Sequence, residues 1–205
     1  MCPASALLEP EGADRGGVPG GPGGGFEGLP KRQLAECVCL GESVGGQLLL
    51  ESLLRENQSK GVFAALVDLY QVLDFETLWP GAEQNLLWVR CGSALQGFKC
   101  LDLLLRDENF TCVLGDFRGL GPAGLRGIQP SAWYRLQRLA HQREGGCLLW
   151  TDAPMIRCAD IRLFLERPRG VGDLEASRER LRADLEQGIE VDRAGRRAGV
   201  EPMTG

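Results

Sequence analysis

The feature that most constrains the fold is a glycine-rich turn between a buried strand and an amphipathic helix. The apolar run at 34–40 (LAECVCL) predicts a short buried strand, and leucines with the spacing of one helical face follow at 49–54. A strand, a glycine loop and a helix form the context that the phosphate-binding motif G-x-x-x-x-G-K-S/T requires. The residues of this loop are Gly41, Glu42, Ser43, Gly45, Gly46 and Gln47.

The chemistry of this loop is incomplete. Gln47 stands where the motif has its lysine, and Leu48 stands where a Ser or Thr should hold magnesium. A register shifted by one residue places Gly46 and Gln47 at those positions, so neither register supplies a cation for the phosphates or a hydroxyl for the metal. Backbone N–H groups can still bind a phosphate here. We favour a tight turn without a ligand, because Glu42 adds negative charge beside any anion.

Composition limits the partners. A chain of 205 residues has room for one domain with a sizeable core, and its net charge of -5 gives no overall attraction for nucleic acid or anionic membrane. No apolar run approaches the roughly 18 residues of a membrane span. The N-terminus lacks the basic and apolar regions of a secretion signal. We therefore expect a cytoplasmic protein with no membrane partner.

The eight cysteines are scattered singly. None forms a C-x-x-C pair, and the one histidine, His141, has no cysteine at metal-ligand spacing. Free, buried thiols in a reducing compartment are the favoured interpretation, and a zinc site is the second. Cys37 and Cys39 alternate along the first strand, so both thiols should point to one face of the sheet.

The rest of the chain alternates strands and helices. Residues 1–27, rich in Gly and Pro, predict a flexible tail, and 28–168 form the core. The charged segment 169–205 predicts a solvated helix with a Leu174, Leu181 and Leu185 stripe and a disordered end. Strands are predicted at 62–68, 86–90, 110–116, 147–151 and, as an edge strand, 161–165; helices are predicted at 93–106 and at 131–142, with Ser131 as N-cap. The fold class is therefore α/β, a mostly parallel sheet with helices on both faces.

The order of these elements resembles the ATPase core of RecA-type recombinases over 28–168. The segments that carry the resemblance are GLP at 28–30, the loop ESVGG, ALVDLYQVLD, NLLWVRC, VLGDFRG and LLWTD. The strings NLLWVRC, LLLRDENFTCVLGDFRG and PSAWYRLQRLA are also similar to the shorter RecA-like proteins of the ImuA and SulA type. The resemblance implies a RecA-like P-loop core and a role in the bacterial DNA-damage response.

Departures from that family imply a pseudo-ATPase. The lysine and the hydroxyl of the phosphate loop are missing, and Tyr70 stands at the position of the family's catalytic glutamate. A phenol has an ordinary pKa of about 10, so Tyr70 cannot act as a general base at neutral pH. Asp116 matches the family's acidic residue that helps to position magnesium, and Thr151 matches the end of the strand with the sensing glutamine. Phosphoryl transfer depends on these groups. We expect no catalytic residue, no metal and no hydrolysis of ATP with Mg²⁺. Asp116 is favoured as a strand-end residue that caps a turn, and Asp68 and Asp74 as strand-end and turn residues.

Five arginines are candidates for contact with a partner or with DNA. In the helix 131–142, the apolar stripe of Trp133, Leu136, Leu139 and Ala140 should face the core. The candidate arginines on and around this helix are Arg118, Arg126, Arg135, Arg138 and Arg143. They form one basic patch if they share a face; otherwise they are ordinary exposed arginines. The loop 119–130 has one cation and no aromatic residue to stack on a base, so any DNA contact should be weak or indirect.

Three functions follow from the resemblance. The leading hypothesis is a non-catalytic RecA-like protein that acts by protein–protein interaction in the SOS or translesion response, with RecA or an ImuB-like polymerase adaptor as partner. The second is a weak nucleotide-binding ATPase that borrows a cation from a neighbouring subunit. The third is a SulA-like inhibitor of cell division that binds a cytoskeletal GTPase.

Overall fold

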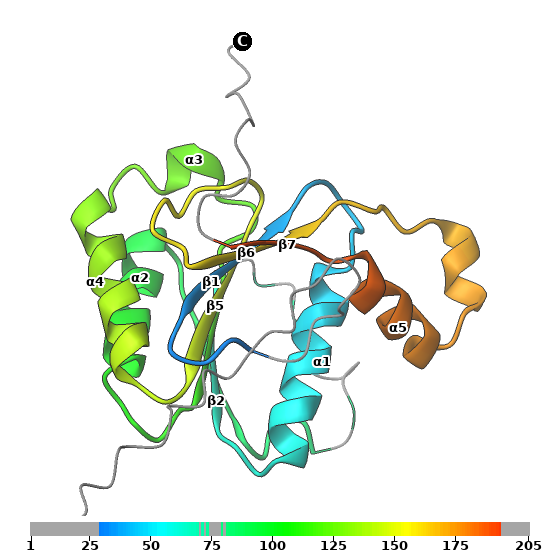
Figure 1. Cartoon of the computed structure of the whole chain (residues 1–205), viewed down its shortest axis with the longest axis horizontal. Helices are drawn as coiled ribbons and strands as arrows, with labels where there is room; N and C mark the ends of the chain where they lie inside the picture. The colour runs from blue at the N-terminus through cyan, green and yellow to red at the C-terminus, as the bar shows by residue number, and fades with distance from the viewer. Residues whose placement is uncertain (1–28, 70, 72, 74–78, 80, 194–205) are drawn as a thin grey trace, which may run out of the picture.

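The computed structural model describes residues 29–69, 71, 73, 79 and 81–193. A seven-stranded sheet in the order β3-β2-β4-β5-β1-β6-β7 forms its centre (Figure 1). The six strands from β1 to β6 pair in parallel, and β7 adds to β6 antiparallel. The strands are β1 (Leu34–Cys39), β2 (Ala64–Asp68), β3 (Leu86–Arg90), β4 (Cys112–Asp116), β5 (Gly146–Thr151), β6 (Ile161–Leu165) and β7 (Glu190–Arg193).

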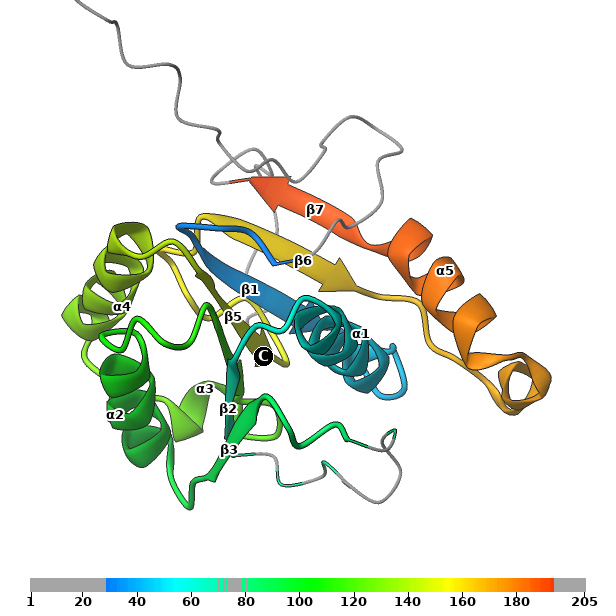
Figure 2. The ribbon, with the colours of Figure 1, turned by 90° about the horizontal axis from the view of Figure 1, so that it is seen from below.

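Helices cover both faces of this sheet. The helices are α1 (Gly46–Ser59), α2 (Ala94–Leu104), α3 (Gly121–Gly124), α4 (Pro130–Gln142) and α5 (Arg178–Gly188), and a 3-10 helix, η2 (Val171–Glu175), precedes α5. In both ribbon views α2 and α4 lie on one side of the sheet, and α1 and α5 lie on the other (Figures 1 and 2). This arrangement confirms the predicted α/β class and the mostly parallel sheet.

The central strands are buried because they are covered on both faces. Every residue of β1, β2, β4 and β5 is buried. One apolar cluster fills the space under α1 and α5, and a second fills the space under α2 and α4. The predicted stripe of α4 lies in the second cluster, with Trp133, Leu136 and Ala140 buried and Leu139 packed against them.

Three local predictions are wrong. Ser131 is not the N-cap of α4: the helix begins at Pro130 and Gln129 is the N-cap, because proline has no N–H to satisfy and its fixed φ suits the first helical position. Strand β6 is not an edge strand, since it pairs with both β1 and β7. The edge is β7, in a segment predicted to fray; it has four residues with little apolar character (EVDR), too short for an alternating pattern to show.

Several predictions lie outside the described residues, namely Tyr70, Asp74, the N-terminal tail 1–27 and the end of the chain from 194. The free-thiol prediction is confirmed for the cysteines in the described part: all seven are free, six are buried and Cys100 is half-buried. Within the same residues, no helix combines the length and the apolar character that a membrane crossing would need.

Candidate functional site

The glycine loop leaves the carboxyl end of β1 and leads directly into α1. Gly41 has φ +119° and Gly45 has φ +95°, left-handed values that glycine adopts without strain. Ser43, at φ +55°, shares this region. Gly45 is the N-cap of α1, and its carbonyl accepts the N–H of Leu49 at 3.0 Å. The strand, glycine loop and helix predicted from the sequence are therefore present.

A pocket of about 920 Å³ opens beside this loop. Its walls come from the loop, the first turn of α1, the segments after β4 and β5, and the segment that leads to α5. Ligands of open α/β sheets bind at this position, outside the carboxyl ends of the strands. The pocket is therefore the candidate functional site.

One wall of the pocket is an ion pair between Arg118 and Asp116. Arg118 Nε lies 2.9 Å from Asp116 Oδ1, and Nη2 lies 2.5 Å from Oδ2. The Arg118 N–H also donates to Oδ1 at 3.2 Å, which confirms Asp116 as a strand-end residue that caps a turn. Burial disfavours the charged guanidinium, yet the hydrogen bonds and charge of Asp116 outweigh it and raise the pKa of Arg118. Both oxygens of this buried carboxylate are thus committed within the chain.

Arg118 also lies over the start of α1. A Cβ on Gly46 would lie 2.5 Å from Arg118 Nη1 and 2.8 Å from Cys39 Sγ, so only glycine fits without a shift. A hydrogen bond with Cys37 and the charge of Arg118 lower the pKa of Cys39, despite its burial. Burial raises the pKa of Cys37 well above its ordinary value. Both thiols lie in the cluster under α1, as their alternation predicted.

The opposite wall belongs to the C-terminal segment. The N–H of Arg169 donates to the carbonyl of Ser43 at 3.0 Å. A Cβ on Gly45 would lie 2.7 Å from Leu185 Cδ1 and 3.4 Å from Arg169 Nε. Leu185 is the one buried side chain of α5 among its described residues. The glycine loop is therefore packed against residues more than 120 positions later in the sequence.

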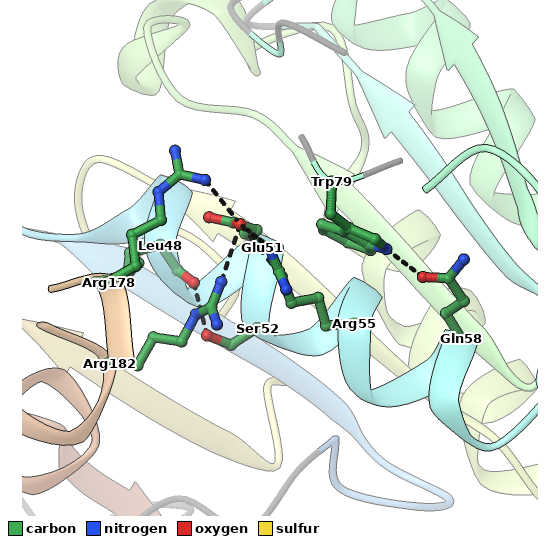
Figure 3. A network of polar contacts seen from close by, with 8 residues as sticks. All are labelled: Leu48, Glu51, Ser52, Arg55, Gln58, Trp79, Arg178 and Arg182. Carbon is green, nitrogen blue, oxygen red and sulfur yellow. Dashed lines mark hydrogen bonds and ion pairs between the residues drawn. The ribbon is translucent and has the colours of Figure 1, made fainter. Parts of the chain in front are cut away.

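A buried carboxylate on α1 holds α5 in place (Figure 3). Glu51 Oε1 accepts hydrogen bonds from Arg178 at 3.1 Å and from Arg182 at 2.9 Å, and it pairs with Arg55 at 3.3 Å. The guanidinium of Arg55 also stacks over the Trp79 ring, 4.5 Å from its centre. Because Glu51 is buried, these arginines supply the charge that makes its burial tolerable.

The charges of the pocket do not favour a polyanion. Its walls contain four carboxylates, from Glu42, Glu51, Asp152 and Asp173, and three guanidiniums, from Arg118, Arg169 and Arg178. Two polar atoms in the walls, Gln47 Oε1 and Arg169 Nε, are buried without a hydrogen-bond partner in the described part of the chain. The pocket thus offers one acceptor and one donor that its own residues leave unpaired.

The five candidate arginines do not gather into one basic patch. Arg118 is locked to Asp116, and Arg143 is buried and donates to the carbonyl of Leu104 at 3.1 Å. Arg135 is exposed but pairs with Asp102 on α2 at 2.5 Å. Arg126 and Arg138 are exposed. Of the five candidates, Arg135 and Arg138 thus share the exposed side of α4.

Other polar residues singled out in the sequence serve the fold. Asp68 is buried and accepts the N–H of Gln71 at 2.6 Å and Nε1 of Trp88 at 3.0 Å. His141 lies half-exposed with Nε2 2.9 Å from Asp160 Oδ2. Thr151 donates to the fully buried Glu36 at 3.1 Å.

Sequence reasoning missed the residues of the C-terminal wall. Arg169 and Arg178 of the wall, and the nearby Arg182, lie in a segment whose high charge predicted a solvated helix; Leu185 belongs to the predicted stripe of that helix and is buried. The signal available was the apolar position Leu185, together with a glutamate, Glu51, inside the leucine-rich face of α1. A charge at a buried helical position predicts a partner of opposite sign, although not where that partner comes from in the chain.

No group of three or more His, Cys, Asp or Glu side chains suited to a metal ion occurs among residues 29–69, 71, 73, 79 and 81–193. No known protein family matches this sequence, and no curated protein is significantly similar to it. The chemistry of the pocket therefore has to be argued from its own residues.

Proposed function

We propose that this chain is a non-catalytic RecA-like protein that acts by protein–protein interaction in the cytoplasm during the bacterial DNA-damage response, as ImuA-like proteins do. The observation that carries the proposal is the pairing of Arg118 with Asp116. The carboxylate that resembles the magnesium-positioning residue already has both oxygens bonded to a guanidinium. Coordination of a metal by Asp116 would require this buried pair to break first.

The phosphate side of the site supports the same conclusion. Gln47 and Leu48 supply neither a cation nor a hydroxyl. Two of the three arginines in the walls, Arg118 and Arg178, pair with carboxylates of the chain. A nucleoside triphosphate carries several negative charges and would face three carboxylates here besides Glu51, whose charge its arginine partners compensate. Hydrolysis would then lack the electrostatic stabilisation on which phosphoryl transfer depends.

The exposed side chains of α2 and α4 suit contact with a protein. On α2, Leu95 is 51% exposed and Leu103 is 67% exposed; on α4, Tyr134 is 58% exposed. Arg138 lies on the exposed side of the same helix. Exposed tyrosine and arginine residues are enriched in protein interfaces. A DNA contact through these helices would be weak, because Arg135 is already paired with Asp102.

The test measures association of the purified chain with the host recombinase and with an ImuB-like polymerase adaptor. We expect binding at micromolar concentration to one of them, and a loss of at least tenfold in affinity when Tyr134→Ala and Leu103→Ser are combined. Phe63→Ser, at a residue that is 53% exposed outside these helices, is the matched control. Absence of association with both partners at micromolar concentration would reject the proposal.

The second candidate function is the binding of a nucleotide without rapid hydrolysis. The unpaired Gln47 Oε1 and Arg169 Nε in a pocket of about 920 Å³ favour it. Titration of a fluorescent ATP analogue, with and without Mg²⁺, decides between the two. Saturable binding at micromolar concentration that Arg169→Ala weakens would support this candidate, and no binding up to millimolar concentration would leave the scaffold function alone.

A further inference from the structure

Two thiols outside the pocket lie within reach of each other. Cys91 directly follows β3, and Cys100 lies in the middle of α2. The short turn at Gly92 and Ser93 brings α2 back past the end of the strand, and the two Sγ atoms are 3.8 Å apart. A disulfide bond has a length of about 2.05 Å, so the sulfurs need to approach by roughly 2 Å.

The two thiols differ in access to solvent. Cys91 is 1% exposed, whereas Cys100 is half-buried. Burial, together with the hydrogen bond that its S–H donates to Cys100, raises the pKa of Cys91 to about 11. Cys91 therefore keeps its proton at neutral pH. Cys100 is the sulfur that a dissolved oxidant meets first.

We propose that Cys91 and Cys100 form an oxidation site at which the chain closes an intramolecular disulfide, with hydrogen peroxide as the oxidant. The sulfur of Cys100 attacks the peroxide, the O–O bond breaks, and one water leaves as Cys100 becomes a sulfenic acid. The sulfur of Cys91 then attacks Cys100, the S–S bond forms, the S–O bond breaks and a second water leaves with the Cys91 proton. Two thiols are oxidised by two electrons in total, and one hydrogen peroxide is reduced to two waters.

Other thiols in the described part of the chain are less suited to this reaction. Cys112 and Cys147 are buried in the middle of the sheet, and burial raises the pKa of each to about 12. Cys37 and Cys39 are hydrogen-bonded to each other, but both are buried, with 0% and 4% of their surface exposed, so a dissolved oxidant reaches them less readily than it reaches Cys100. Geometry and access therefore single out Cys91 and Cys100.

The sequence makes the bond easy to map. The test uses the full, folded chain with the substitution Cys2→Ser. The protein is exposed to equimolar hydrogen peroxide, its remaining free thiols are blocked with iodoacetamide, and it is digested with trypsin without reduction. Trypsin cuts after Arg90, Lys99 and Arg106, so the two thiols fall on separate peptides, 91–99 and 100–106. We expect the mass of the two peptides joined, lost after reduction, and two fewer free thiols per monomer. A Cys100 sulfinic acid with Cys91 still free, or a bond to another cysteine or another chain as the main product, would overturn the proposal.

Variants separate the site from general thiol oxidation. Cys100→Ser should abolish the linked mass and leave Cys91 unreacted, whereas Cys158→Ser, at another buried thiol, should leave the linked mass unchanged. The disulfide closes a loop of ten residues, which restricts the unfolded chain, so oxidation should raise the Tm by about 5 °C. The same oxidant should produce no such rise in Cys91→Ala. An equal rise in that variant would contradict the assignment.

Discussion

The two faces of the sheet are covered by different kinds of contact. On the face of α2 and α4, the cover is apolar: Phe98 and Trp133 meet edge to face with ring centres 5.3 Å apart, and Leu136 is fully buried. On the other face, the inner layer of α1 is equally apolar, but α5 is attached to it by one buried leucine and by arginines on Glu51.

The difference matters because one wall of the pocket comes from the segment that contains α5. Apolar contacts hold α2 and α4 at any ionic strength, whereas the attachment of α5 depends on ion pairs whose arginines are partly exposed, Arg178 by 51% and Arg182 by 16%. The wall that the α5 segment supplies is therefore the part of the described fold that salt should loosen first, and the α2 and α4 cover is the part that salt should leave in place.

The largest effect is expected on the apolar cover. Trp133→Ala removes a buried ring that packs against both Phe98 and Phe117, and should lower the free energy of unfolding by about 3–5 kcal/mol. Urea unfolding followed by circular dichroism measures this loss. Tyr134→Ala, one residue further at an exposed position, is the control and should change stability by less than about 0.5 kcal/mol.

Water should be excluded equally from the two apolar clusters on the two faces of the sheet. The pH dependence of stability tests this expectation. Cys112 lies in the cluster under α1, Cys147 lies in the cluster under α2 and α4, and burial raises the pKa of each to about 12. Unfolded thiols have a pKa of about 8.5, so above that pH the unfolded chain loses protons that the folded chain keeps. Stability therefore falls between about pH 8.5 and 12, by about 2 kcal/mol for each thiol at pH 10.

Unfolding in urea at pH 8 and pH 10 checks this prediction. Cys112→Ala and Cys147→Ala should each lower stability at pH 8, yet each should remove an equal part of the alkaline loss. A pH dependence that only one of the two variants reduces would show that one face of the sheet admits water.

Loss of the single apolar anchor of α5 should have a smaller and more local effect. Leu185→Ala leaves the helix with its ion pairs alone and should cost about 2 kcal/mol, at the low end for a buried leucine because α5 is an outer element that can move inward. Hydrogen exchange should accelerate in α5 and leave α4 unchanged. Equal acceleration in both helices would mean that the two covers unfold as one unit.

The smallest effects are expected when the ion pairs of α5 are removed one at a time. Arg182→Ala should cost about 1 kcal/mol and Arg178→Ala less than about 0.5 kcal/mol, because Arg182 is the more buried partner of Glu51 and exposed pairs contribute little. Thermal unfolding at 0.05 and 0.5 M NaCl measures both losses, and salt should reduce them. Lys60→Ala removes an exposed pair with Glu56 at the end of α1 and is the matched control.

The strands and helices were predictable because each depends on the spacing of apolar residues within one short segment of the chain. The runs at 62–68, 86–90 and 110–116 form strands whose bounds lie within two residues of the predicted ones. The leucines of α1 form its buried face, as predicted. The glycine loop was predictable for the same reason. Its turn needs left-handed φ values, and the glycines appear in the sequence where those values occur.

The composition of the pocket was not predictable in this way. Its second wall comes from Arg169, Arg178 and Leu181, far from the loop in sequence, and no local pattern shows which buried carboxylate an arginine will contact. The dispersal of the five candidate arginines has the same origin, because Arg118 and Arg143 turn inward to partners on β4 and α2.

The sequence alone thus predicted the strands and helices, the incomplete phosphate-binding motif and the free thiols. Each of these features depends on residue types and spacings within a short stretch of the chain. Only the tertiary structure decided three further features: the packing of α5 on the glycine loop, the ion pair of Arg118 with Asp116, and the proximity of Cys91 to Cys100. Each depends on distances between side chains that only the closed sheet and its helices set.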